Sequence, residues 1–202
     1  TGENAAKTIG HGLSTAPKFI IVKNLGVLQW PCYYQQADGT DGIVWLDQDG
    51  NGEAAGTAYW NDTNPTASVF SVGDSSNTGG LTSPDYIAYC FSEIENYSKI
   101  GLYTGNGNAD GVFIYTGMKP ELVISKYITV DDDWRMMDTV RDTYNVATRR
   151  IYANTDAVEF NGASQSKDFL SNGFKIRTDE AGFNANGGVY LYLAFAESPF
   201  KY

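Results

Sequence analysis

The sequence predicts an all-β protein: a two-sheet, jelly-roll-like sandwich built from two pseudo-symmetric tandem repeats. Short apolar runs bounded by Gly, Asn, Asp and Pro recur along the chain, which is the pattern of strands joined by turns. No segment of ten or more residues has a helical period. The 202 residues include 14 Tyr and 22 Gly, a balance typical of many strands and tight turns.

An internal repeat organises these runs, because residues 17–93 recur as residues 120–197. Each copy opens with Pro, an aliphatic run and Lys, and a Trp follows at nearly the same offset, Trp30 in one copy and Trp134 in the other. Both tryptophans are expected in the core. The matching positions are Pro, Lys, Trp, Phe and aliphatic residues, so we interpret the repeat as a copied scaffold and expect function in the loops that differ.

The expected strands follow one another between turn residues. In the first repeat and the junction they span residues 19–23, 32–34, 43–46, 58–60, 69–72, 86–93, 99–104 and 112–116. In the second repeat they span residues 122–126, 135–138, 150–152, 174–177 and 190–196, with one helical turn expected at 168–170. The junction contains no linker, so we expect its strands to serve both halves. One domain is predicted over residues 1–202, with repeats at approximately 8–100 and 101–202.

Composition and charge exclude some classes of partner. Only 19% of the residues are charged and the net charge is −10, with the Lys and Arg residues scattered. A surface that binds the phosphate backbone of a nucleic acid needs clustered positive charge, so no nucleic acid partner is expected. No run of 18 or more apolar residues occurs, so no membrane insertion is expected.

One loop has the start of a calcium-binding pattern. Asp47, Asp49 and Asn51 place oxygen donors at positions 1, 3 and 5, before Gly52 at position 6. The twelfth position should supply a bidentate Glu but holds Ala58. A hairpin turn needs the same residue types for its positive φ angles. No metal and no other cofactor is therefore predicted, and Asp47, Asp49 and Asn51 are the candidate ligands should an ion bind to this loop.

The sequence marks no catalytic constellation, so no enzyme activity is predicted. His11 is the only histidine, and no Gly-x-Ser-x-Gly motif accompanies it. Glycosidase chemistry needs two carboxylates about 5–10 Å apart, and no pair stands out among the 24 acidic residues. Cys32 and Cys90 lack a metal-type spacing, and free core thiols are favoured over a disulfide between them.

Two tryptophans of the first repeat are candidate ligand-binding residues. Trp45 and Trp60 have no Trp counterpart in the second repeat, so the repeated packing does not demand them. An exposed indole can stack on a sugar ring while Asn61 and Asp62 hydrogen-bond its hydroxyl groups. The alternative is that both tryptophans fill a larger core in the first repeat.

Seven blocks of sequence together form a recognisable pattern. The first, residues 10–23, reads His-Gly-Leu, then Ala-Pro, an aliphatic strand and Lys. The others are residues 59–66, 86–93, 97–99, 103–107, 169–175 and 194–201. This pattern resembles a domain of unassigned function in bacteriophage tail-fibre-like virion proteins, and it covers nearly the whole chain.

The resemblance implies a distal, C-terminal module at the virion surface, with no catalytic residues to assign. We predict that the module attaches to a glycan on the host surface. One alternative is a structural virion component, such as a capsid decoration or tail adaptor, that binds other virion proteins. A second alternative is a surface-glycan depolymerase. A homotrimer is one assembly that the resemblance allows.

Overall fold

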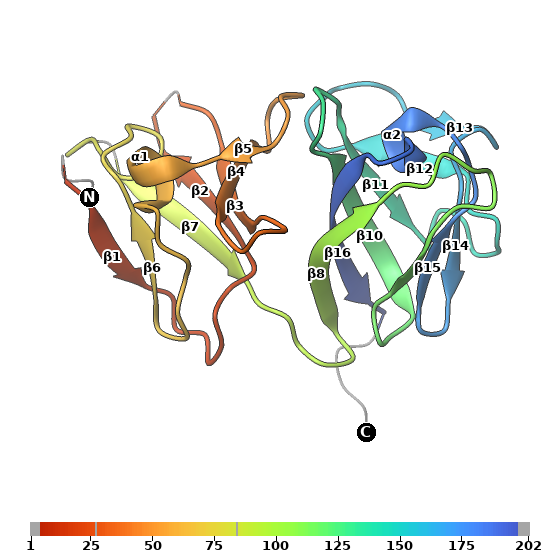
Figure 1. Cartoon of the computed structure of the whole chain (residues 1–202), viewed down its shortest axis with the longest axis horizontal. Coiled ribbons are helices and arrows are strands. Elements are labelled where there is room, and N and C mark those ends of the chain that lie inside the picture. Colours follow the sequence, from red (N-terminus) through yellow and green to blue (C-terminus); the bar gives the residue numbers. More distant parts are fainter. Residues whose placement is uncertain (1–4, 27, 84, 198–202) are drawn as a thin grey trace. The chain divides into compact units, whose positions relative to one another are not determined.

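The computed structural model describes residues 5–26, 28–83 and 85–197. The chain forms two compact units, unit 1 from Thr1–Gln48 and Gly52–Glu93, and unit 2 from Asp49–Asn51 and Ile94–Tyr202. Figure 1 colours the strands of unit 1 from red to yellow-green and those of unit 2 from green to blue. The two described helices are single turns, neither able to cross a membrane. The all-β prediction is therefore confirmed.

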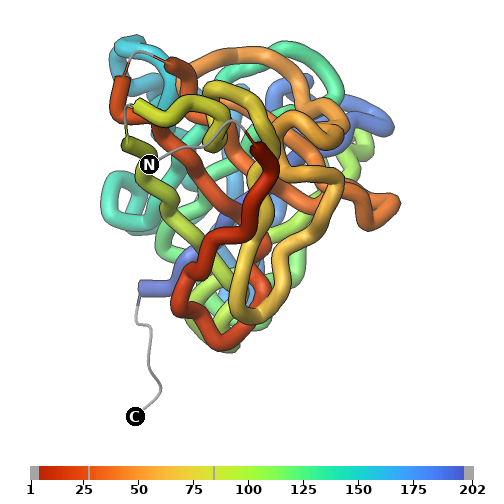
Figure 2. The backbone as a smooth tube through the Cα atoms, turned by 90° about the vertical axis from the view of Figure 1, so that its left-hand side faces the viewer, coloured from red at the N-terminus to blue at the C-terminus, as the bar shows by residue number. Residues whose placement is uncertain are grey.

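Unit 1 packs two antiparallel sheets around a core. Its elements are β1 (Lys7–Gly10), β2 (Phe19–Asn24), β3 (Pro31–Gln35), β4 (Asp41–Trp45), β5 (Glu53–Ala54), α1 (Gly56–Trp60), β6 (Val69–Val72) and β7 (Tyr86–Phe91). The larger sheet has the order β5-β4-β3-β2-β7. In the smaller sheet β1 pairs with β6, which Figure 2 shows side by side in red and yellow. The core takes Ile20 and Tyr33 from one sheet, Phe70 from the other, and Trp60 from α1.

Unit 2 has its own pair of antiparallel sheets. Its elements are β8 (Ser98–Thr104), β9 (Phe113–Tyr115), β10 (Pro120–Tyr127), β11 (Trp134–Asp138), β12 (Arg149–Tyr152), β13 (Phe160–Asn161), β14 (Lys167–Leu170), β15 (Gly173–Ile176), α2 (Ala181–Asn184) and β16 (Val189–Ala196). The sheet orders are β13-β12-β11-β10-β16-β8 and β14-β15-β9. Val123, Phe174 and Tyr190 meet in the core between them. Each unit is thus a sandwich of two sheets.

The two units share the strand order that a sequence repeat requires. β2 lies between β3 and β7, and its counterpart β10 lies between β11 and β16. The register also agrees, because Phe19 pairs with Phe91, and Leu122, at the matching position of the repeat, pairs with Phe195. The pair β1-β6 corresponds to the pair β9-β15. Unit 2 adds β8 and β14 to this shared plan.

The repeated lysine has the same structural role in both units. Lys23 Nζ donates to the carbonyl of Leu28, and Lys126 Nζ donates to the carbonyl of Asp132. Each acceptor lies two residues before the repeated tryptophan, so the lysine anchors the loop that leads into the next strand. This shared contact gives a structural reason for the lysine in both copies.

Some local predictions were wrong. Residues 58–60 belong to α1 instead of a strand, because Gly56 has a φ of 62° and Asn61, with a φ of 55°, ends the helix in the left-handed conformation. Residues 168–170 lie in β14 instead of a helical turn. Within the described strands, β8 and β9 pair only with strands of unit 2, so the junction strands do not serve both halves. The single-domain prediction stays untested.

Predictions for the core were confirmed in part. Trp134 is fully buried, whereas its counterpart Trp30 is partly exposed. Cys32 and Cys90 are free thiols, as favoured from the sequence. Burial raises the pKa of Cys90 to about 11 and the pKa of Cys32 well above its usual value, so neither thiol is ionised at neutral pH.

Candidate functional site

Trp60 lies in the core of unit 1 and is only 1% exposed. Its ring meets the ring of Tyr33 edge-on, with the centroids 5.8 Å apart. No face of the indole is open to a sugar, so the prediction that Trp60 binds a ligand is wrong. The physical reason is α1, which turns this side chain inward at the end of the helix.

The other predicted ligand-binding residues do not gather at one place. Trp45 is partly exposed, lies at the end of β4 and meets Tyr59 edge-on at 5.7 Å. Asp62 instead lies near Asp41 and raises the pKa of its carboxyl group. Asp41 begins β4, whereas Trp45 ends it. A strand of five residues is about 13 Å long, so one sugar ring does not bridge these positions. Ligand binding by Trp45, Asn61 or Asp62 stays a prediction.

The candidate calcium loop makes the hydrogen bonds of a structural turn. Asp47 Oδ1 accepts a hydrogen bond from the backbone nitrogen of Trp30 at 3.0 Å. The carbonyl of Asp49 accepts from Lys126 Nζ at 2.6 Å, and the backbone nitrogen of Asn51 donates to Asp131 Oδ1 at 3.0 Å. Within the described part of the chain, no three His, Cys, Asp or Glu side chains form a metal-binding group.

His11 connects two loop segments of unit 1. Its Nδ1 accepts a hydrogen bond from the backbone nitrogen of Leu13 at 3.1 Å. The proton then resides on Nε2, which donates to the carbonyl of Thr66, also at 3.1 Å. Both ring nitrogens therefore hold backbone in place, which is a structural role.

A hollow of about 390 Å³ opens in unit 2. Its wall comes from the segment before β8, the turn before β10, the residue after β11, the β14-β15 turn and the end of β16. Antiparallel pairing brings these strand ends to one edge of the unit. Six polar side chains line the hollow: Asn96, Lys119, Glu121, Thr139, Ser171 and Glu197.

These six side chains are not used by the fold. None of them makes a hydrogen bond or ion pair with another residue among those that the structure describes. Several other charged side chains of unit 2 form ion pairs: Lys175 Nζ lies 2.9 Å from Asp110, for example. The hollow therefore presents one ammonium, two carboxylates, two hydroxyls and an amide whose hydrogen-bonding capacity is free for a ligand.

A β-bulge directs Glu121 into this site. Pro120 pairs with Ala196 and Leu122 pairs with Phe195, so Glu121 is the extra residue between two consecutive pairs. Bulges change the direction in which a side chain points, and they are common next to functional sites. Asn96, another residue that lines the hollow, has a φ of 62°, a conformation that costs energy for a residue with a side chain.

The exposed ring of Tyr115 borders the hollow, and Phe113 is exposed on the same strand. Tyr115 is 64% exposed and Phe113 is 46% exposed, because both point outward from β9 while Ile114 between them points into the core. The hydroxyl of Tyr115 would lie 3.7 Å from a Cβ at Gly117, a residue of the hollow's wall. The positive φ of Gly117, 77°, favours glycine at this position. The tyrosine ring is thus at the rim of the hollow.

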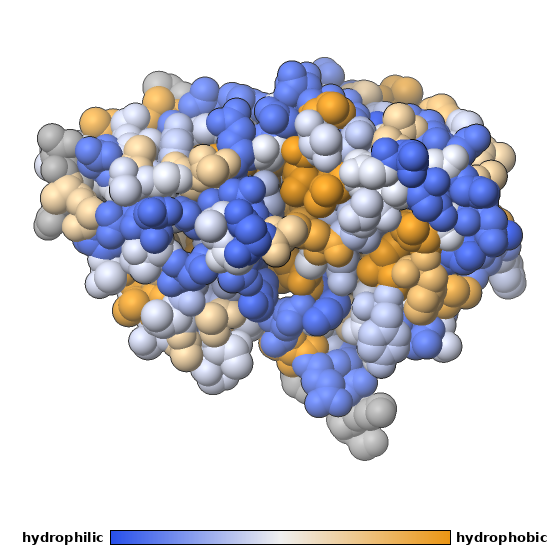
Figure 3. All heavy atoms as spheres, in the orientation of Figure 1, coloured by the Kyte–Doolittle hydropathy of each residue, from blue (hydrophilic) through white to orange (hydrophobic). Residues whose placement is uncertain are grey.

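A second, more apolar hollow adjoins the first. It measures about 550 Å³ and shares Glu121 and Ala196 with the polar hollow. Its apolar lining consists of Leu122, Met136, Val140 and Phe195. On the face drawn in Figure 3, apolar residues of unit 2 reach the surface beside polar ones. Polar groups and apolar surface side by side suit a ligand that has both, such as a sugar ring.

Sequence reasoning missed this site because its residues are far apart in the chain. One local signal could have found its rim: the triplet Phe113-Ile114-Tyr115 alternates before a Gly turn, which places two aromatic rings on one side of a short strand. The six polar residues carry no such signal, since they come from five separate segments.

Comparison with known proteins identifies the family of the chain. Residues 1–199 match the model of a family described as Domain of unknown function (DUF7483), so the chain belongs to this family. No curated protein and no solved structure matches it. The last residues of the sequence block 194–201, after Glu197, lie outside the described residues.

Proposed function

We propose that this member of a family without an assigned function is a virion surface module, of the tail-fibre-like kind, that attaches to a glycan on the host surface. The observation that carries the proposal is the polar hollow of unit 2, whose six polar side chains have no partner among the described residues and whose rim holds an exposed tyrosine. This combination suits a sugar, because polar side chains can hydrogen-bond the sugar's hydroxyl groups while an aromatic ring packs on the apolar face of the sugar ring.

The charge of the site narrows the class of glycan. Glu121 and Glu197 place two carboxylates in the hollow, and Lys119 supplies one ammonium. Two carboxylates repel a strongly acidic sugar and accept hydrogen bonds from neutral hydroxyl groups. We therefore expect a neutral or amino-sugar-containing polysaccharide of a bacterial surface.

Replacing Tyr115 with alanine is expected to weaken glycan binding about ten-fold, which corresponds to about 1.4 kcal/mol. The ring is mostly exposed, so the melting temperature should stay the same. Binding of the labelled chain to an array of bacterial surface glycans measures the first quantity, and circular dichroism measures the second.

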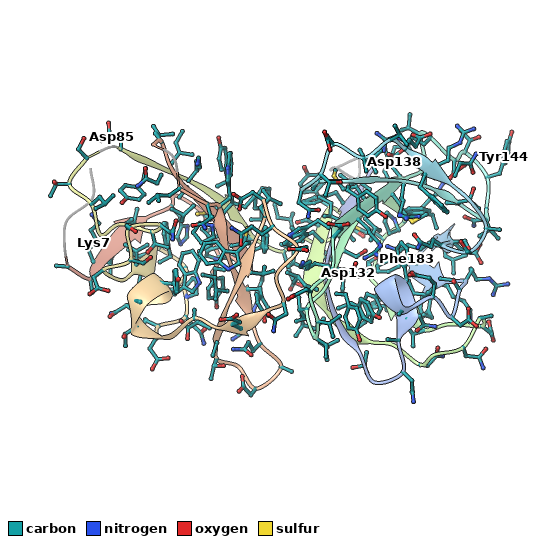
Figure 4. All side chains as sticks on the ribbon, turned by 90° about the horizontal axis from the view of Figure 1, so that it is seen from above. Lys7, Asp85, Asp132, Asp138, Tyr144 and Phe183 are labelled. Carbon is teal, nitrogen blue, oxygen red and sulfur yellow. The ribbon has the colours of Figure 1, made fainter. Side chains whose placement is uncertain are left out.

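Tyr144→Ala is the matched control. Tyr144 is 85% exposed and is not part of the hollow; Figure 4 shows it pointing away from unit 2. The control should bind like the unmodified chain, whereas Glu121→Gln should lose binding together with Tyr115→Ala. Equal binding by all three variants would contradict the assignment of the site.

The same experiment separates the alternative functions. New reducing ends during incubation with the bound glycan would favour the depolymerase, with Glu121 and Glu197 as its carboxylate pair. Firm association with virion particles, without binding to any glycan of the array, would favour the structural component.

A further inference from the structure

Two carboxyl groups of unit 1 lie near each other at one end of its larger sheet. Asp41 is the first residue of β4 and is 3% exposed. Asp62, an exposed residue, follows α1 in the left-handed conformation with a φ of 49°. The carboxyl group of Asp62 is near enough to Asp41 to raise the pKa of that buried group. Two acidic groups are therefore close neighbours at this end of the sheet.

The backbone holds both residues in place. The carbonyl of Asp41 accepts hydrogen bonds from the backbone nitrogen of Ala55 and from Gln36 Nε2, each at 3.2 Å. The loop that contains Asp62 is fixed by Asn64, whose Nδ2 donates to the carbonyl of Gly39 at 2.7 Å. The same side chain accepts a hydrogen bond from the hydroxyl of Tyr33 at 2.9 Å. The loop is therefore fixed against the sheet on the side of the pair.

No positive group of the described chain compensates this pair. Neither Asp41 nor Asp62 forms an ion pair with a described Lys, Arg or His residue. Asp41 Oδ2 is buried and accepts no hydrogen bond from any residue that the structure describes. A buried carboxylate oxygen without a donor or a cation is costly, so a proton or a cation from solution must compensate it. Burial, and to a lesser extent the neighbouring Asp62, raise the pKa of Asp41.

We propose that Asp41 and Asp62 bind a calcium ion between their carboxylates. The donors are oxygen atoms alone, which favours a hard cation, and calcium accepts water and irregular geometry more readily than magnesium does. Only two carboxylates contribute, so water must complete the coordination. The expected dissociation constant is therefore about 10⁻⁴ to 10⁻³ M, the range of extracellular calcium modules. The site is separate from the loop that begins at Asp47 and does not depend on glycan binding in unit 2.

Terbium luminescence tests the site directly, because Trp60 lies two residues before Asp62 and can transfer excitation energy to a bound Tb³⁺ ion. Titration of the full chain with Tb³⁺, excited through tryptophan, should give saturable emission that millimolar Ca²⁺ displaces. The variant Asp62→Asn should lose at least ten-fold in Tb³⁺ affinity. This residue is exposed, so the variant should fold normally.

Asp47→Asn is the matched control, since asparagine can still accept the hydrogen bond from Trp30 and the change tests the other acidic loop. It should bind Tb³⁺ like the unmodified chain. In addition, 5 mM Ca²⁺ should raise the melting temperature of the chain and of Asp47→Asn, but not of Asp62→Asn. Absence of saturable emission would mean that the pair shares only a proton, and a loss confined to Asp47→Asn would place the ion in the other loop. Either result overturns the proposal.

Discussion

Replacement of Trp60 with alanine is expected to lower the free energy of unfolding by about 3–5 kcal/mol. The side chain is 1% exposed and packs with Ile20, Tyr33 and Phe70, so the substitution leaves a cavity that the surrounding strands cannot fill. Domains are typically stable by only about 5–15 kcal/mol, so unit 1 should be close to unfolding at 37 °C. Urea denaturation followed by circular dichroism measures the loss.

The conservative variant Trp60→Phe serves as the control. It keeps most of the apolar volume and should recover a large part of the lost stability. The indole Nε1 of Trp60 has no hydrogen-bond partner among the described residues, so the phenyl ring gives up no hydrogen bond. A Trp60→Ala chain with an unchanged urea midpoint would show that the indole is not a core residue.

Replacement of Lys167 with methionine is expected to stabilise the protein in a pH-dependent manner. Lys167 is completely buried; its Nζ donates to Ser125 Oγ at 3.1 Å and lies 4.7 Å from the ring centre of Phe183. Figure 4 shows Phe183 inside unit 2. No described carboxylate forms an ion pair with this lysine. Burial, followed by the positive charge of Arg135, lowers its pKa from 10.5 to about 7.

The direction of the effect follows from this pKa. Below about pH 7 the lysine is protonated in both states, and the folded protein bears the full cost of the buried charge. Between pH 7 and pH 10.5 only the unfolded chain keeps the proton, so stability rises with pH. Each pKa unit is worth about 1.4 kcal/mol, and the shift therefore amounts to about 5 kcal/mol. Methionine removes this cost. The gain in unfolding free energy from Lys167→Met should therefore be largest at pH 6 and small near pH 10.5.

The measurement is the difference in unfolding free energy between Lys167→Met and the unmodified chain at several pH values, because titration of all other groups cancels in that difference. Lys175→Met is the control: Lys175 is partly exposed and pairs with Asp110, so its replacement should bring no such gain. A Lys167→Met advantage that does not change with pH, or a loss at pH 6, would contradict the buried charge.

The sequence by itself determined the strands and the repeat. Period-two and continuous apolar runs place most strands within a few residues, since alternation depends only on neighbouring side chains. The repeat predicted equivalent strand order, and the matching pairs Phe19 with Phe91 and Leu122 with Phe195 have the same register. The free state of both cysteines also followed from their apolar surroundings.

Only the tertiary structure decided where the candidate sites lie. Residues 58–60 are rich in aromatic side chains that favour strands, but the backbone at Gly56 and the packing of Trp60 against Tyr33 make them helical. The polar hollow collects residues from five strand ends or turns, and the pair of Asp41 and Asp62 joins a strand to a helix end. Both sites depend on contacts between segments that are distant in the sequence. Local sequence patterns reflect only the conformational preferences of neighbouring residues, so they do not predict these contacts.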